Sequence, residues 1–138
     1  SMPNFVVEKL ESNLSIELKK STNGAKILVV GMSYKKDIDD IRESPAIKII
    51  DILKSKNAKV NYHDNFVKQL PSIKNFPSLK GMKSVPLTIK NIQSNDIILI
   101  LTNHSYIDFK EIGKHSKLII DTRNALENIK CKAKVIKA

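Results

Sequence analysis

The stretch from Gly31 to Pro45, GMSYKKDIDDIRESP, concentrates side chains that can bind ligands as few other parts of this chain do. It follows the apolar run ILVV and ends in Ser-Pro, a pair typical of a helix start. Within it, Lys35 and Arg42 carry positive charges that suit phosphate or carboxylate groups. The sequence leaves open the alternative that both cations pair with acids of the same stretch, namely Asp37, Asp39, Asp40 or Glu43.

A third cation, Arg123, follows another apolar run in IIDTRN. If the two runs are parallel strands of one sheet, their carboxyl ends meet at the edge where open α/β sheets bind ligands. Arg123 would then converge with Lys35 and Arg42 on one crevice. Three cations from two strand ends are more than a solvated surface requires, and they predict an anion site.

The turn after the first apolar run lacks the glycines of the fingerprint G-x-G-x-x-G. Those glycines let the backbone approach a pyrophosphate, and Ser33, Tyr34 and Lys35 would crowd it. Asp64 ends the next predicted strand, where a dinucleotide-binding domain places its ribose-binding acid. Without the glycine turn, an Asp that caps a loop is the favoured interpretation. We predict that this domain does not cradle a dinucleotide by itself.

The histidines and the single cysteine form no recognisable metal or nucleophile motif. His63, His104 and His115 are scattered, and such residues more often lie at the surface or cap an element. His104, in TNHS, is expected either to line the crevice or to stabilise its loop. Cys131 lies in KCKAK, where the lysines could lower the pKa of the thiol, but no base accompanies it, and a structural role is favoured.

Four predicted strands position these residues. The runs 26–31 and 96–101 are apolar at nearly every position, which is typical of central parallel strands buried on both faces. Residues 58–63 and 117–121 predict two further strands, and 134–136 is a candidate edge strand. Residues 65–85 contain two prolines and a glycine with no sustained period, so they are predicted to be irregular.

Helices are predicted between the strands. Residues 5–20 have apolar side chains four apart, with Pro3 in the first turn and Asn23-Gly24 as the stop signal. A second helix runs from Pro45 to Ser55 behind the N-cap Ser44, and shorter ones span 86–93 and 106–114. Strands alternating with helices predict a three-layer α/β/α sandwich with a Rossmann-like, mainly parallel sheet, preceded by an N-terminal helix.

A phospho-relay receiver domain has a similar architecture. It requires paired acids at the end of the first strand and an Asp at the end of the central third strand. Gly31 and Thr102 occupy those places, so this alternative is disfavoured.

Composition excludes several classes of protein. The 138 residues suit one domain, and the net charge of +10 is spread as +3 over residues 1–60 and +7 over residues 61–138. With no Trp and few other aromatic residues, a lysine-rich solvated surface is favoured over a nucleic-acid site. The apolar runs are too short to cross a membrane, and no secretory signal opens the chain, so we expect a cytoplasmic protein.

The stretch from Gly31 to Pro45 closely resembles the signature G-x-x-[FY]-K-x-x-T-x-D-x-R-x-S-P of the UDP-glucose/GDP-mannose dehydrogenase family, in its C-terminal UDP-binding domain. Residues 119–124 resemble the family's late D-x-R-N motif, and residues 1–10 resemble the end of its central dimerisation helix. Ile38 replaces the usual Thr, and residues 63–65, HDN, replace Y-D-P. The resemblance covers nearly the whole chain.

Enzymes of this family oxidise the C6 alcohol of a nucleotide sugar to a carboxylate, using two NAD and a catalytic cysteine. The resemblance implies that Tyr34 and Lys35 contact the nucleotide sugar, that Arg123 binds the substrate, and that Arg42 reaches the NAD. The family's NAD turn and nucleophile lie upstream, and Cys131 does not match the nucleophile, so this chain is expected to hold no catalytic residue. NAD would be bound mainly by a missing N-terminal domain.

The resemblance thus implies a fragment that is inactive alone, with residues 1–23 as the end of the central dimerisation helix and residues 24–138 as the UDP-sugar-binding domain. The expected whole is a cytoplasmic NAD-dependent nucleotide-sugar 6-dehydrogenase, a homodimer or larger, that makes a uronic acid for surface polysaccharide. DTRN and TNHS favour UDP-N-acetylhexosamine over UDP-glucose as its substrate. The rival hypothesis is a non-catalytic Rossmann-like domain that binds a nucleotide or a partner protein through the same crevice.

Overall fold

The computed structural model describes all residues, 1–138, and its centre is a five-stranded sheet in the order β2-β1-β3-β4-β5. All four strand pairs are parallel. The predicted Rossmann-like sheet is therefore confirmed, and so is the candidate edge strand. The strands are β1 (Lys26–Val30), β2 (Lys59–His63), β3 (Ile97–Ile100), β4 (Leu118–Asp121) and β5 (Lys134–Lys137).

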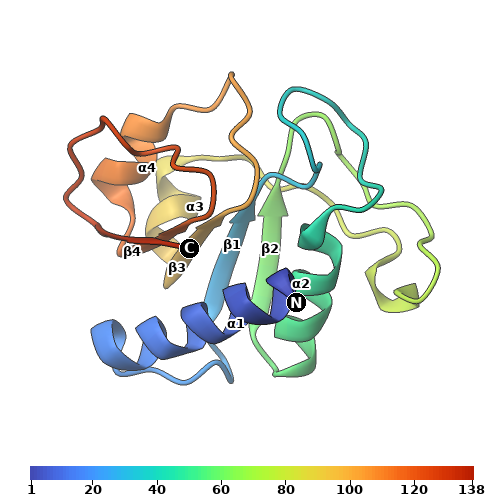
Figure 1. Ribbon diagram of the computed structural model, residues 1–138, viewed down its shortest axis with the longest axis horizontal. Helices are drawn as coiled ribbons and strands as arrows, with labels where there is room; N and C mark the ends of the chain where they lie inside the picture. The colour runs from blue at the N-terminus through green and yellow to red at the C-terminus, as the bar shows by residue number, and fades with distance from the viewer.

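The strand order reverses beside β1, because β2 lies on one side of it and β3 on the other. In the register of the sheet, Val30 is level with His63 of β2 and Ile100 of β3. The loops that follow these strands therefore leave the sheet at one edge, where they gather above the arrowheads of β1 and β2 in Figure 1. Ligands of open α/β sheets bind at such a reversal.

Helices cover both faces of the sheet, as the three-layer prediction requires (Figure 1). On one face lie α1 (Met2–Asn13) and α2 (Pro45–Ser55), and on the other lie α3 (Ile89–Ser94) and α4 (Phe109–His115). Side chains of β1 alternate between the two cores: Ile27 and Val29 join the core under α1 and α2, whereas Leu28 and Val30 join the other. This two-sided burial explains why the strand is apolar at every position from Ile27 to Val30.

The first helix differs from its prediction at both ends. It begins at Met2, and a π-helical turn, η1 (Leu14–Leu18), continues it until Lys19 adopts a left-handed conformation. The stop is therefore Lys19, several residues before Asn23-Gly24. Apolar residues spaced strictly by four drift around an α-helix of 3.6 residues per turn, and the wider π turn keeps Leu14 and Leu18 against the core.

Side-chain caps set the starts of the other helices. Ser44 Oγ accepts a hydrogen bond from the Ala46 N–H at 3.2 Å, which confirms the predicted start of α2. Thr88 and Asp108 cap α3 and α4, so both helices begin three residues later than predicted. Residues 65–85 are irregular, as predicted, apart from the short 3₁₀ helix η2 (Pro77–Leu79). No helix of the structure has the length and apolar character that a membrane span requires.

Candidate functional site

The polar turn after β1 begins at a point of close backbone approach. Gly31 has a φ of +94°, and a Cβ at this position would lie 2.3 Å from the Thr102 Cβ, in the loop after β3. Only glycine combines this left-handed backbone conformation with so close an approach to the neighbouring loop. The loops after β1 and β3 are therefore pressed together where the strand order reverses.

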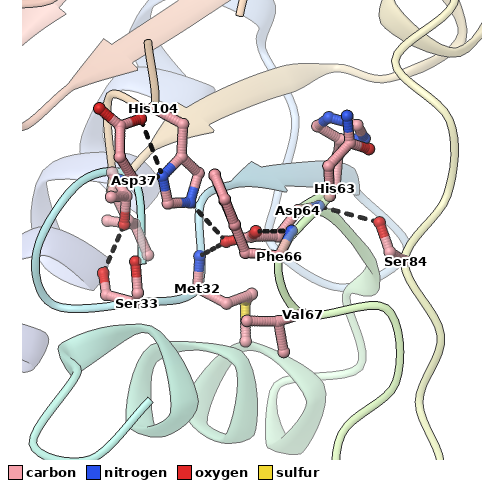
Figure 2. A network of polar contacts seen from close by, with 12 residues as sticks. Met32, Ser33, Asp37, His63, Asp64, Phe66, Val67, Ser84 and His104 are labelled. Atoms are coloured by element: carbon pink, nitrogen blue, oxygen red, sulfur yellow. Dashed lines mark hydrogen bonds and ion pairs between the residues drawn. The ribbon is translucent and has the colours of Figure 1, made fainter. Parts of the chain in front are cut away.

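Polar side chains from the neighbouring strands hold the first part of the turn (Figure 2). The Met32 N–H donates to Asp64 Oδ2 at 2.7 Å, and Thr102 Oγ1 donates to the Ser33 carbonyl at 2.5 Å. Within the turn, Ser33 Oγ donates to the Lys35 carbonyl at 2.6 Å. The backbone on either side of Tyr34 is thus tied to the loops after β2 and β3.

Two fully buried side chains, Asp64 and His104, meet beneath this turn. His104 Nε2 lies 2.8 Å from Asp64 Oδ2, and Asp64 Oδ1 accepts a hydrogen bond from the Phe66 N–H at 2.8 Å. The Asp37 N–H donates to His104 Nδ1 at 2.8 Å. The loop-capping role predicted for Asp64 and the loop-stabilising alternative for His104 are confirmed.

Of the surface or capping positions predicted for the histidines, the surface alternative does not hold for His63 and His104, which are 4% and 0% exposed and bond to loop backbone atoms instead. His63 Nδ1 lies 2.7 Å from the Val85 carbonyl, and its Nε2 lies 3.0 Å from the Tyr106 hydroxyl. His63 is the last residue of β2 and His104 lies in the loop after β3, so both side chains are buried at the carboxyl edge of the sheet, where the loops pack together. His115 lies in the last turn of α4, with its Nε2 3.1 Å from a Glu111 carboxylate oxygen.

Asp37, which the sequence offered as a partner for a nearby cation, binds the loop after β3 instead. Its carboxylate accepts hydrogen bonds from the Ser105 N–H at 2.7 Å and the Ser105 hydroxyl at 2.5 Å. These bonds, led by the hydroxyl, lower the pKa of Asp37 below its ordinary value. Lys35 forms no ion pair and remains available to a ligand.

Arg42 pairs with an acid of the same stretch, which is one of the two alternatives that the sequence left open. Its guanidinium makes a two-point contact with the Asp40 carboxylate, with N···O distances of 3.0 and 2.9 Å. This hydrogen bonding lowers the pKa of Asp40 to about 2. The Arg42 side chain is 86% exposed, and exposed ion pairs of this kind contribute little to stability.

A cavity of about 530 Å³ opens beside the turn. It brings together Lys35 and Arg42, two of the three cations that the sequence placed at one crevice, with Tyr34, and its remaining lining residues are Ile38, Asp40 and Glu43. Tyr34 is half-exposed, with 53% of its surface accessible. The cavity offers the aromatic ring of Tyr34 and the unpaired ammonium of Lys35, a combination that suits a phosphorylated ligand with a planar group, whereas Arg42 is paired with Asp40.

Arg123 lies next to this cavity without lining it. Its Nε donates to the Leu101 carbonyl at 2.9 Å, and an Nη donates to the Tyr34 carbonyl. Its backbone N–H donates to Asp121 Oδ1 at 2.9 Å. The third predicted cation therefore joins the loop after β4 to the Tyr34 turn, and its remaining guanidinium donors are left for another partner.

Sequence patterns gave no sign of the aromatic pair beside this edge. Phe66 and Tyr106 are 42% and 41% exposed, and the Phe66 ring lies 4.8 Å from the His104 ring, centroid to centroid. Tyr106 accepts a hydrogen bond from the Asn65 N–H at 2.8 Å. The two rings cover the buried Asp64 and His104 pair from solvent.

Two further expectations concern metal and thiol chemistry. No group of three or more His, Cys, Asp or Glu side chains is arranged to hold a metal ion. Cys131 is partly buried, and burial raises the pKa of its thiol, an effect that the nearby Asp121 reinforces. The expectation that neighbouring lysines lower this pKa is therefore wrong.

These features define a class of protein: an open, parallel α/β domain with a polar cavity, lined by the unpaired Lys35, at the reversal of strand order. Within this class, residues 28–128 match the UDP binding domain of the UDP-glucose/GDP-mannose dehydrogenase family. The match includes the whole Tyr34 turn and Arg123. The chain belongs to this family.

Relatives of known activity agree with this assignment. The chain is 35% identical over 133 residues to the UDP-glucose 6-dehydrogenase of Rickettsia prowazekii, with 91% of this chain and 29% of the relative covered. It is 34% identical over 137 residues to the UDP-N-acetyl-D-mannosamine dehydrogenase of Methanococcus vannielii, with 91% and 27% covered. The chain therefore spans less than a third of the length of these enzymes.

Solved structures show the same fold. The UDP-D-ManNAc dehydrogenase of Pyrococcus horikoshii superposes with a TM-score of 0.76 at 26% identity, over 99% of this chain and 30% of that one. The UDP-N-acetyl-mannosamine dehydrogenase Cap5O of Staphylococcus aureus follows with a TM-score of 0.71 at 25% identity, over 99% and 31%. The family predicted from the Gly31–Pro45 signature is confirmed.

Proposed function

We propose that this chain is the substrate-binding domain of an NAD-dependent nucleotide-sugar 6-dehydrogenase, which oxidises the C6 alcohol of a UDP-sugar to a carboxylate. The observation that carries the proposal is the cavity beside Tyr34 and Lys35, which lies inside the segment matched by the family's UDP binding domain. No comparable observation favours a non-catalytic role. Because the chain covers less than a third of its relatives, activity belongs to the longer enzyme.

In this proposal, Tyr34 and Lys35 contact the nucleotide sugar. The Lys35 ammonium has no acidic partner of its own and supplies a point charge for a diphosphate. Arg123, which already holds the Tyr34 carbonyl, directs its remaining guanidinium donors toward the substrate. The substrate is a UDP-N-acetylhexosamine or UDP-glucose, the two kinds of substrate named for its relatives.

The turn after β1 does not fit NAD as a dinucleotide cradle. Gly31 is packed against Thr102, and no second glycine opens the turn to a pyrophosphate. We therefore assign NAD mainly to an N-terminal domain outside this chain. Only the exposed Arg42 would reach toward the cofactor from this side.

The wider setting is part of the same proposal. The exposed Met2 and Phe5 on α1 suit a helix that continues into a central dimerisation segment, so the whole enzyme would be a homodimer or larger. It would work in the cytoplasm, where its product serves as a uronic acid precursor of surface polysaccharide.

Calorimetry with UDP and the 138-residue chain tests the proposed binding role. A charge-assisted hydrogen bond contributes about 1.5–3 kcal/mol, so Lys35→Ala and Arg123→Ala should each weaken UDP binding about 10- to 100-fold. Lys36→Ala is the matched control, because this neighbouring lysine does not line the cavity. Unchanged affinity in both Lys35→Ala and Arg123→Ala would refute the assignment.

Kinetics of the full-length enzyme test the role of Arg42. Arg42→Ala should raise the KM for NAD more than the KM for the UDP-sugar. An effect confined to the sugar would contradict the proposed contact with the cofactor.

A further inference from the structure

The buried pair of Asp64 and His104 lies outside the cavity, yet it contacts both ends of the turn that carries Tyr34 and Lys35 (Figure 2). At one end the Met32 N–H donates to Asp64, and at the other the Asp37 N–H donates to His104. A single buried unit thus spans the turn from beneath.

The partners of His104 define its tautomer. A backbone N–H can only donate, so Nδ1 must offer its lone pair to the Asp37 N–H. Nε2 then carries the proton and donates it to Asp64 Oδ2 at 2.8 Å. The Asp37 carboxylate lies 4.0 Å from Nδ1, which is too far for a hydrogen bond. The imidazole therefore accepts a hydrogen bond from the turn and donates one to Asp64.

Both side chains are 0% exposed and their polar atoms are fully used within this network. Buried hydrogen-bond networks are costly to leave half satisfied, so each partner restricts the geometry of the others. The turn cannot shift at Met32 or Asp37 without leaving a buried polar atom unpaired. Tyr34 and Lys35 lie between these two fixed points.

We propose that His104 and Asp64 are positioning residues, which hold the Met32–Asp37 turn so that Lys35 and Tyr34 face the ligand in one arrangement. The inference rests on the proposed function, since it assumes that this turn binds the UDP-sugar. His104 itself touches no ligand. Its effect on binding therefore passes through the turn.

Two substitutions each remove one of the two hydrogen bonds of His104 and keep the other. In His104→Gln, the side-chain amide can reach the place of Nε2 and keep the donor to Asp64, while the acceptor for the Asp37 N–H is lost. In His104→Asn, the amide oxygen can take the place of Nδ1 and keep that acceptor, while the donor to Asp64 is lost. Each variant removes about one hydrogen bond, so each should weaken UDP binding about five- to tenfold.

A double-mutant cycle distinguishes positioning from general destabilisation. His104→Gln is compared with the parent sequence in the wild-type and the Lys35→Ala backgrounds, by calorimetry with UDP on the 138-residue chain. In the Lys35→Ala background, His104→Gln should weaken UDP binding by less than about twofold, because the turn then carries little charge to be positioned. His63→Gln is the matched control, a second buried histidine at this edge whose bonds reach Val85 and Tyr106 instead. An equal loss in both backgrounds would overturn the inference.

Amide hydrogen exchange and nitrogen NMR give a readout that needs no ligand. In the wild-type chain, His104 should show a protonated Nε2 and a bare Nδ1, and a proton on Nδ1 would overturn the inference without any variant. In His104→Gln, the Asp37 amide should exchange faster while amides of α2 keep their rates. Uniform acceleration across the domain would mean a purely structural role.

These measurements also separate the two hypotheses. If the wild-type chain binds no UDP, or if neither Lys35→Ala nor Arg123→Ala weakens the binding, the proposed function fails. The positioning of the turn is then decided by the exchange and tautomer results alone. If Lys35→Ala weakens binding but the His104→Gln effect is independent of Lys35, only the positioning inference fails.

Discussion

Replacing Gly31 by Ala should destabilise the domain sharply, because two separate costs meet at this residue. Its φ of +94° is unfavourable for a residue with a side chain, at about 1–2 kcal/mol. The added Cβ would also lie 2.3 Å from the Thr102 Cβ and 2.6 Å from the Thr102 backbone nitrogen. Overpacking of this kind costs about 1–3 kcal/mol more, so we expect a total loss of about 2–5 kcal/mol in the free energy of unfolding.

Gly24→Ala is a matched control for the conformational part of this cost. Gly24 has a φ of +80°, close to that of Gly31, but no heavy atom lies within 4 Å of its added Cβ. Its substitution should therefore cost only about 1–2 kcal/mol. The difference between the two variants in the free energy of unfolding therefore measures the cost of the contact with Thr102.

Urea unfolding of the two variants and the wild type gives the three free energies, provided that the slope of the transition is unchanged. In a Thr102→Gly background the cost of Gly31→Ala should fall only in part, because backbone atoms of residue 102 also lie within 2.7 Å of the added Cβ. If Gly31→Ala lowers the free energy of unfolding no more than Gly24→Ala does, the loops after β1 and β3 do not approach each other as closely as described. The geometry derived for the Tyr34 turn would then be wrong as well.

Three further predictions concern ionisable groups. Burial opposes the charge of Asp96, but hydrogen bonds from Lys20 and a backbone N–H outweigh it and lower the pKa below 3.8. Asp96→Asn should therefore lower the free energy of unfolding by about 1–3 kcal/mol at pH 7. Urea unfolding should show this difference shrinking as the pH falls from 3.8 through the lower pKa of the folded state, because in this range the unfolded carboxylate takes up a proton before the folded one does. By NMR, Asp40 should titrate at about 2, and in Arg42→Ala the midpoint should return toward 3.8; an unchanged midpoint would exclude the ion pair. Burial raises the pKa of Cys131, so at pH 8 its thiol should react with Ellman's reagent more slowly than in the urea-unfolded chain, and equal rates would contradict this.

The sheet could be predicted because burial of a strand on both faces produces a recognisable pattern in the sequence. Strands covered by helices on both faces have apolar residues at consecutive positions, as β3 and residues 27–30 of β1 show. Helix starts were less well predicted where the capping residue was overlooked. Thr88 and Asp108 each accept a hydrogen bond from a backbone N–H of the first turn, and these side chains, rather than Pro86 or Tyr106, determine where α3 and α4 begin.

The candidate site could be predicted only in part, because its contacts join distant segments. Local sequence placed Tyr34, Lys35 and Arg42 at one strand end, and these three do line one cavity. The bond between Asp64 and His104 connects residues forty positions apart, and no periodic pattern encodes it. The available signal was the group of polar residues near the carboxyl ends of the buried strands, such as Asp64 after β2 and Thr102 near the end of β3. It identified the edge of the sheet, while the partner of each residue depended on how the loops pack.

The two halves of the cavity differ in how firmly they are held, and this difference suits a site shared between domains. The backbone around Lys35 is fixed by side chains from the loops after β2, β3 and β4. Arg42, by contrast, is restrained by one exposed ion pair, which costs little to break. In the proposed function the rigid half meets the substrate that this domain binds. In the same proposal the adjustable half would face a cofactor held by another domain, and there Arg42 would exchange Asp40 for an anionic group of that cofactor.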